Sequence, residues 1–119
     1  MRGVEEWKSL LRAALREALR ARQSHAVAVI RETLAAIDNA EAADSSAAPP
    51  VQHGVIAGGV AGVGAGEVAR RVLSPEAVAA IVEREMQERR EAAETYAALG
   101  RDDEARKLRL QLEVLASLL

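Results

Sequence analysis

The first amphipathic pattern of the chain covers residues 4–22. Apolar side chains recur there at steps of three and four, the spacing that places them on one face of an α-helix. Two further leucines, Leu10 and Leu19, widen this apolar face. The sequence therefore predicts an amphipathic helix whose apolar positions are Val4, Trp7, Leu11, Ala14, Leu15 and Ala18.

A second helix is predicted from Ser24, whose hydroxyl could accept a hydrogen bond from a free amide of the first turn. The joint to the first helix is short, which makes the two helices antiparallel neighbours. We therefore expect a helical hairpin over residues 4–44. The positions of the second helix with heptad-like spacing are Val27, Ile30, Leu34, Ile37 and Glu41.

The helical periodicity is lost over residues 45–73. This stretch contains Pro49-Pro50 and then, over residues 54–66, a run rich in glycine, whose backbone entropy cost disfavours regular structure. We interpret it as a long connection. Residues 67–73 regain a helical composition, which indicates one short extra helix at its end.

Ser74-Pro75-Glu76 marks the start of a third helix, because it combines a capping hydroxyl, a proline at the first helical position and an acidic first turn. Gly100 marks its end, since glycine accepts the left-handed conformation that follows many helices. The helix is therefore expected to run to about Leu99. Its predicted apolar positions are Val78, Ile81, Val82, Tyr96 and Leu99.

A fourth helix is predicted from Asp102, because three acidic residues there match the positive end of a helix dipole. Its leucines at 108, 112, 115 and 119 form one apolar row, and a second row lies beside it. This arc is wider than one neighbouring helix covers, so the helix packs on two sides or meets a partner. The candidate protein-contact residues are Leu110, Val114, Leu115, Leu118 and Leu119.

These patterns predict an all-α protein: a single domain over residues 1–119, with hairpins at 4–44 and 74–119 packed into a bundle. The composition agrees, because hydrophobic residues make up 50% but aromatic residues only 2%, so that Ala, Leu and Val supply the core. There is no cysteine and no signal-peptide pattern at the N-terminus, so we expect a cytoplasmic protein. The formal net charge of −2 gives no reason to expect DNA or a membrane as a partner.

A basic ridge is the main candidate binding feature. Cationic residues occur at four-residue steps along the first helix, and a phosphate backbone could lie along them. The alternative is a solvated helix face whose cations only maintain solubility. Trp7 is the only aromatic residue near this ridge and sits in the apolar register, so shape and phosphates would dominate RNA recognition. The candidate contact residues are Lys8, Arg12, Arg16, Arg20, Arg22 and Arg31.

Other site chemistries find little support. The segment Gly62-Val-Gly-Ala-Gly66 lacks the Gly-Lys-Ser/Thr and the preceding strand of a nucleotide-binding loop. His25 and His53 lie in different segments without metal-ligand spacing. The serines are scattered over caps and loops, and the only lysines are Lys8 and Lys107, so no amidase arrangement is visible. The acidic and basic residues between Glu83 and Glu94 have ion-pair spacing, with Glu85 and Arg89 the best pair. We predict no catalytic, cofactor-binding or metal-ligating residue.

Two stretches resemble the GatB/YqeY family. The first is Leu15-Arg-Glu-Ala-Leu followed by Val29-Ile-Arg-Glu-Thr-Leu-Ala-Ala-Ile-Asp-Asn-Ala-Glu, and the second runs from Glu83 through Tyr96-Ala-Ala-Leu-Gly-Arg-Asp-Asp-Glu-Ala-Arg-Lys-Leu. The resemblance covers most of residues 4–44 and 74–119. It leaves the glycine-rich segment unexplained, as an insertion where the family has a shorter connection.

The resemblance implies a helical module that is accessory to tRNA or translation-linked processes, similar to the helical tail region of the aspartyl/glutamyl-tRNA amidotransferase that shares this domain. A family-level label would be a carbon–nitrogen ligase with glutamine as amido-N donor, although no active site is visible in the residues. Similar proteins continue into a further small helical module after the fourth helix, which we expect to be missing after Leu119. Partners left open are tRNA, a translation-linked protein, and self-association without RNA.

Overall fold

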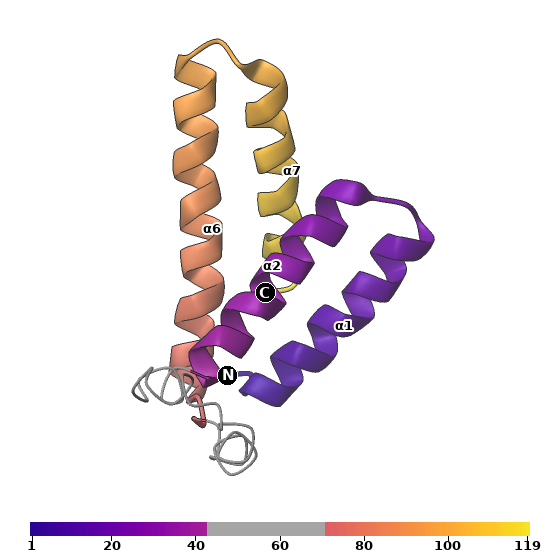
Figure 1. Ribbon diagram of the computed structural model, residues 1–119, viewed down its shortest axis with the longest axis vertical. Helices are drawn as coiled ribbons and strands as arrows, with labels where there is room; N and C mark the ends of the chain where they lie inside the picture. Colours follow the sequence, from indigo (N-terminus) through magenta and orange to yellow (C-terminus); the bar gives the residue numbers. More distant parts are fainter. Residues whose placement is uncertain (43–70) are drawn as a thin grey trace, which may run out of the picture.

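The computed structural model describes residues 1–42 and 71–119, and there the chain forms four α-helices and no strand (Figure 1). The helices pair as two antiparallel hairpins, which confirms the predicted all-α bundle. No helix in the described part is long and apolar enough to cross a membrane. The helices are α1 (Val4–Arg20), α2 (Ser24–Glu41), α6 (Pro75–Ala98) and α7 (Asp102–Ser117).

The predicted connection lies mostly outside the described residues, and so do the glycine-rich run and His53. Its last three residues, 71–73, are described and are not helical, so a short helix does not extend to Leu73 as predicted. Instead the Arg71 amide donates to the Glu41 carbonyl oxygen at 2.8 Å, and Leu73 is buried in the core. This segment therefore leads back from the end of α2 to the start of α6.

The α6–α7 hairpin begins and turns as its sequence predicts. Ser74 caps α6, since its hydroxyl accepts a hydrogen bond from the Ala77 amide at 3.0 Å. Gly100 has φ +76°, and the Arg101 amide next to it donates to the Tyr96 carbonyl oxygen at 2.8 Å. These contacts define a Schellman motif, in which a left-handed residue lets the chain reverse while the last carbonyls of the helix stay bonded.

The α1–α2 hairpin turns through the same motif with a different residue. The Gln23 amide donates to the Ala18 carbonyl oxygen at 3.0 Å, and Arg22 takes the left-handed position with φ +57°. The prediction that Ser24 caps α2 is wrong. The Schellman turn ends at Gln23, so that Gln23 is the N-cap residue and Ser24 is the first helical residue. The side chain of Gln23 makes no cap hydrogen bond.

The core lies where the two hairpins cross. Trp7 of α1 is 4% exposed, and the Arg2 guanidinium lies 5.2 Å from its ring centroid. Two predicted apolar positions are wrong: Leu19 is 48% exposed and Leu99 is 68% exposed, because both lie at hairpin turns beyond the crossing. The side chains with less than 2% exposure are Leu11, Val29, Ile30, Thr33, Ile37, Val78, Val82 and Leu115.

Helix α7 packs on two sides, against α6 and against α2, as its wide apolar arc predicted. Leu115 is therefore fully buried inside the bundle, and its assignment as a protein-contact residue is wrong. Leu110 and Leu119 remain 36% and 64% exposed, and Val114 and Leu118 are half-buried. The end of α7 is tied to the N-terminus, because the Arg2 guanidinium donates to the Leu118 carbonyl oxygen at 2.6 Å.

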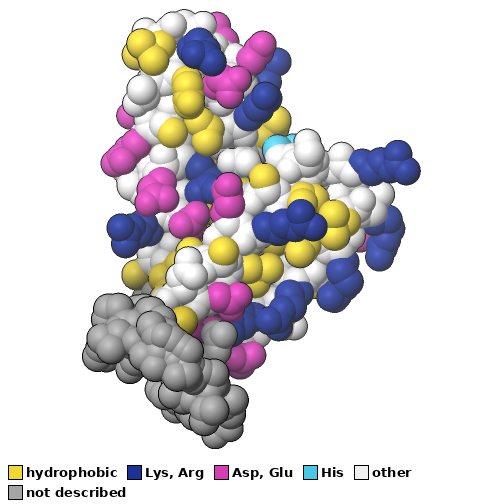
Figure 2. Space-filling model, in the orientation of Figure 1, with side chains coloured by type: hydrophobic (Ala, Val, Ile, Leu, Met, Phe, Trp, Pro, Cys, Tyr) yellow, Lys and Arg dark blue, Asp and Glu magenta, His cyan; other side chains and the backbone are white. Residues whose placement is uncertain are grey.

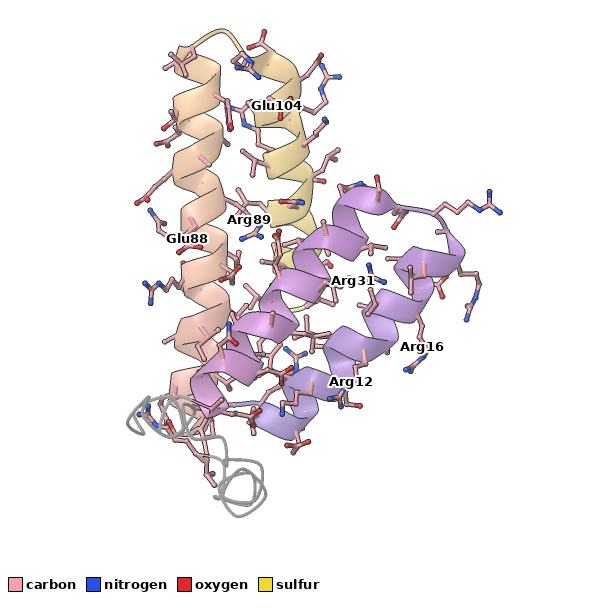
Figure 3. All side chains as sticks on the ribbon, viewed as in Figure 1. Arg12, Arg16, Arg31, Glu88, Arg89 and Glu104 are labelled. Carbon is pink, nitrogen blue, oxygen red and sulfur yellow. The ribbon has the colours of Figure 1, made fainter. Side chains whose placement is uncertain are left out.

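Arg89 of α6 joins the two hairpins at their crossing (Figure 3). Its guanidinium is buried and pairs with Glu85 at 3.0 Å, the ion pair that the spacing predicted. It also pairs with Glu32 of α2 and donates to Gln111 of α7 at 3.2 Å. Gln111 in turn donates to the His25 carbonyl oxygen at 3.2 Å. This network connects α2 to both helices of the other hairpin.

Candidate nucleic-acid interface

Lys8 does not belong to an exposed ridge, so this part of the prediction is wrong. Its side chain is 10% exposed, and its ammonium lies 2.5 Å from the Glu41 carboxylate, which is itself 7% exposed. Asp38 and Glu5 approach the same ammonium at 3.8 and 4.0 Å. A carboxylate in the apolar register of α2 requires a buried cation, and Lys8 is held there rather than offered to a ligand.

The remaining cations of α1 form an exposed row. Arg12 and Arg16 are both exposed, and neither has an ion-pair partner among the described residues (Figure 3). Arg20 pairs with Glu17 at 2.9 Å, but both side chains are about 70% exposed, and such surface pairs contribute little and exchange readily with water. Residues four apart rise about 6 Å along a helix, so these guanidinium groups are spaced for successive contacts.

Arg22 and Arg31 flank an open groove at the turn of the α1–α2 hairpin. The groove has a volume of about 520 Å³ and is lined by Leu19, Arg22, Ser24, Val27, Ala28 and Arg31. Neither arginine has an ion-pair partner in the described part of the chain. Arg31 projects from α2 on the side that faces α1 (Figure 3). The site therefore combines an apolar floor with two free cations.

Positive charge is concentrated in one part of the α1–α2 hairpin, which over residues 1–42 as a whole has seven basic and six acidic residues. Residues 9–31 hold five arginines and one acidic residue, Glu17, and so carry a formal charge of +4 in a chain whose net charge is −2. Figure 2 shows Lys and Arg side chains gathered over the α1–α2 hairpin and acidic side chains along α6. We call the surface formed by Arg12, Arg16, Arg20, Arg22 and Arg31 the arginine face.

The sequence pattern did not predict the groove at the turn of the α1–α2 hairpin. Leu19 and Val27 were placed in apolar stripes that face the core, because helical periodicity does not show how far along a hairpin the neighbouring helices reach. The available indication was Leu19 itself, which widens the stripe at the last turn of α1, where arginines stand on both sides in the sequence. The structure leaves this leucine half in water and next to Arg22.

Replacing Arg22 with Gly should make the protein more stable. The left-handed backbone costs an L-residue about 1 kcal/mol that glycine does not incur, and the side chain of Arg22 has no ion-pair partner among the described residues to offset it. We expect Arg22→Gly to raise the free energy of unfolding by up to about 1 kcal/mol in a urea titration. Unchanged or lower stability would mean that the arginine makes a stabilising contact within the fold.

The described residues contain no group of three or more His, Asp or Glu side chains that could hold a metal ion. His25 is half-buried beside the groove residues, and its carbonyl oxygen is engaged by Gln111. The ion-pair interpretation of the charged run on α6 is confirmed in geometry, since Arg84 lies 3.7 Å from Glu88 and Arg90 lies 3.1 Å from Glu83. These charges are engaged with one another, unlike Arg12, Arg16, Arg22 and Arg31 of the arginine face.

Comparison with known proteins finds no family model, no curated protein and no solved structure that matches this chain, so the resemblance to the GatB/YqeY family stays a prediction.

Proposed function

We propose that this protein is a non-catalytic helical module that binds RNA through the phosphate backbone, using the arginine face. The observation that carries the proposal is that Arg12, Arg16, Arg22 and Arg31 are exposed on one hairpin without ion-pair partners in the described residues. Cations that serve only solubility are usually interspersed with acidic residues, as they are on α6. Within residues 9–31, five arginines are accompanied by one glutamate.

The chemistry of guanidinium suits a phosphate ligand. Its planar set of donors matches two phosphate oxygens at once, and its charge does not titrate at any physiological pH. Each phosphate that an arginine neutralises releases condensed counterions, which drives binding at low salt. The arginine face therefore supports binding that depends on backbone charge and shape, with little dependence on base sequence.

Among RNAs, we propose tRNA as the partner class. The support is the resemblance of residues 4–44 and 74–119 to GatB/YqeY proteins, which implies an accessory role near tRNA. The α1–α2 hairpin carries five exposed arginines, and a folded RNA offers closely spaced phosphates to such a surface. A translation-linked protein is the competing partner.

Self-association through the end of α7 has less support than the sequence suggested. Leu115, the central residue of that candidate surface, is buried, and the carbonyl oxygen of Leu118 is occupied by Arg2. The exposed leucines that remain, Leu110 and Leu119, are nine residues apart in the sequence, and Val114 and Leu118 between them are half-buried. An RNA-binding arginine face is therefore the better-supported function.

A titration of the whole chain with unmodified tRNA tests this proposal. If five arginines contact phosphates, the logarithm of the binding constant should fall with the logarithm of salt concentration with a slope of about −4. Binding that is absent at about 50 mM salt, or that does not respond to salt, would contradict the proposal. A monomeric protein that captures a protein partner but no RNA would favour the competing function.

A further inference from the structure

We infer that the groove at the turn of the α1–α2 hairpin receives one unpaired nucleotide of the bound RNA. This inference rests on the proposed function and deepens it, because it distinguishes RNA with exposed bases from fully paired RNA. The groove is lined by Leu19, Val27 and Ala28, with Ser24 at its side and Arg22 and Arg31 as its cations. A nucleotide has the matching chemistry: a flat base with apolar faces and a phosphate with negative charge.

The backbone of Arg22 supports a binding role for its side chain. The two hairpins turn through the same motif, with Gly100 at one turn and Arg22 at the other, and only glycine takes this conformation without cost. Strained backbone positions persist more often where a side chain serves a ligand than where it serves the fold. Arg22 lines the groove and has no ion-pair partner in the described residues, so its guanidinium is available there.

The charge of the groove lining indicates which kind of ligand it binds. Arg22 and Arg31 are the charged residues of the groove lining, and residues 9–31 carry a formal charge of +4, which favours a ligand with negative charge. A base that packs on the apolar lining of this open groove would place its own phosphate near Arg22 and Arg31. Guanidinium planes also stack on bases, which compensates for the lack of an aromatic side chain in the groove lining.

The positions of the other arginines agree with a nucleotide bound in the groove. Arg16 and Arg12 lie on the same hairpin, about one and two helical turns further from the groove than Arg20, and can contact phosphates of the adjoining strand. In this arrangement the arginine face binds the RNA phosphate backbone, and the groove binds only a base that is unpaired and can leave its stack. Fully paired RNA would make the first set of contacts without the second.

The test compares two RNA probes with the same number of phosphates. One is a stem-loop, and the other is the same stem closed by an abasic ribose-phosphate loop of equal length, so that only the loop bases differ. We expect the wild-type chain to bind the stem-loop at least about fivefold more tightly, the lower end of the effect of stacking one base. The salt dependence should be similar for both probes, since their charges are equal.

Substitutions in the groove lining test whether the preference for the stem-loop arises there. Ala28→Leu fills it, and Leu19→Ser removes part of its apolar lining at a position that is already 48% exposed. Both should reduce the preference for the stem-loop while leaving the salt dependence unchanged. The control is Ala80→Leu, the same substitution at an exposed position on α6, which should keep the preference. Thermal unfolding of each variant checks that the fold is retained.

The outcomes separate the two proposals. Equal binding of both probes by the wild-type chain overturns the nucleotide groove and leaves the arginine face intact, whereas no binding of either probe overturns the proposed function. A stem-loop preference that persists in folded Ala28→Leu and Leu19→Ser variants also overturns the inference. Displacement of both probes by an acidic helical peptide, without any stem-loop preference, would assign the groove to a protein helix instead.

Discussion

Removing Arg12, Arg16 and Arg31 together should weaken RNA binding by about 10²-fold at low salt, because each arginine contributes one phosphate contact. All three are exposed and lack ion-pair partners among the described residues, so Arg→Ala substitutions should not disturb the bundle. The slope of log binding constant against log salt should become less negative by about 2 to 3. Filter binding or fluorescence anisotropy over a salt series measures both quantities.

A charge-matched control distinguishes a local contact from the overall field. Arg84 of α6 and Arg106 and Arg109 of α7 are exposed arginines on the other hairpin. Their triple alanine variant changes the net charge by the same amount and should retain most of the affinity and the wild-type salt slope. If both triple variants lose affinity equally, the arginine face has no special role and non-specific charge accounts for the binding.

Leu115→Ala should lower the free energy of unfolding by about 3 kcal/mol, the cost of a cavity at a fully buried leucine. Leu115 is completely buried where α7 packs against α6 and α2. Large-to-small changes at such positions remove both buried apolar surface and packing contacts. Urea titration followed by circular dichroism measures the change.

Leu119→Ala serves as the comparison for this prediction. The Leu119 side chain is 64% exposed, so its loss should change the stability by less than about 0.5 kcal/mol. A similar effect of the two substitutions, or a small effect of Leu115→Ala, would contradict the packing of α7 on both of its neighbours. The pair of variants thus separates the two leucines that the sequence pattern had grouped together.

Local patterns predicted the helices well because the relevant interactions are short in sequence. The periodicity of residues 4–22, the cap at Ser74 and the glycine at Gly100 each act within one or two helical turns, and all three correspond to the observed elements. The short joint before Ser24 was predicted, but the left-handed conformation of Arg22 was not, because a left-handed C′ position is normally glycine or asparagine. Nothing in the residue type marks this arginine as a turn residue.

Contacts between hairpins were harder to predict from sequence. Lys8 appeared in a basic ridge, but Glu41 lies in the apolar register of α2, and two positions 33 residues apart form one buried pair. Leu115 and Leu119 share a predicted row, yet only the first reaches the crossing of the hairpins. The groove has the same origin: the apolar stripe of α1 continues past the point where α6 contacts α1. Burial at these positions depends on tertiary arrangement, which periodicity does not specify.

An NMR titration of the isotopically labelled chain with tRNA is the sharpest test of an RNA-binding arginine face, because it reports binding residue by residue. We predict that backbone and guanidinium signals shift between Arg12 and Arg31, including those of Arg22, while the α6–α7 turn around Gly100 stays unchanged. Shifts confined to α6 and α7, or no shifts at low salt with saturating tRNA, would contradict this function.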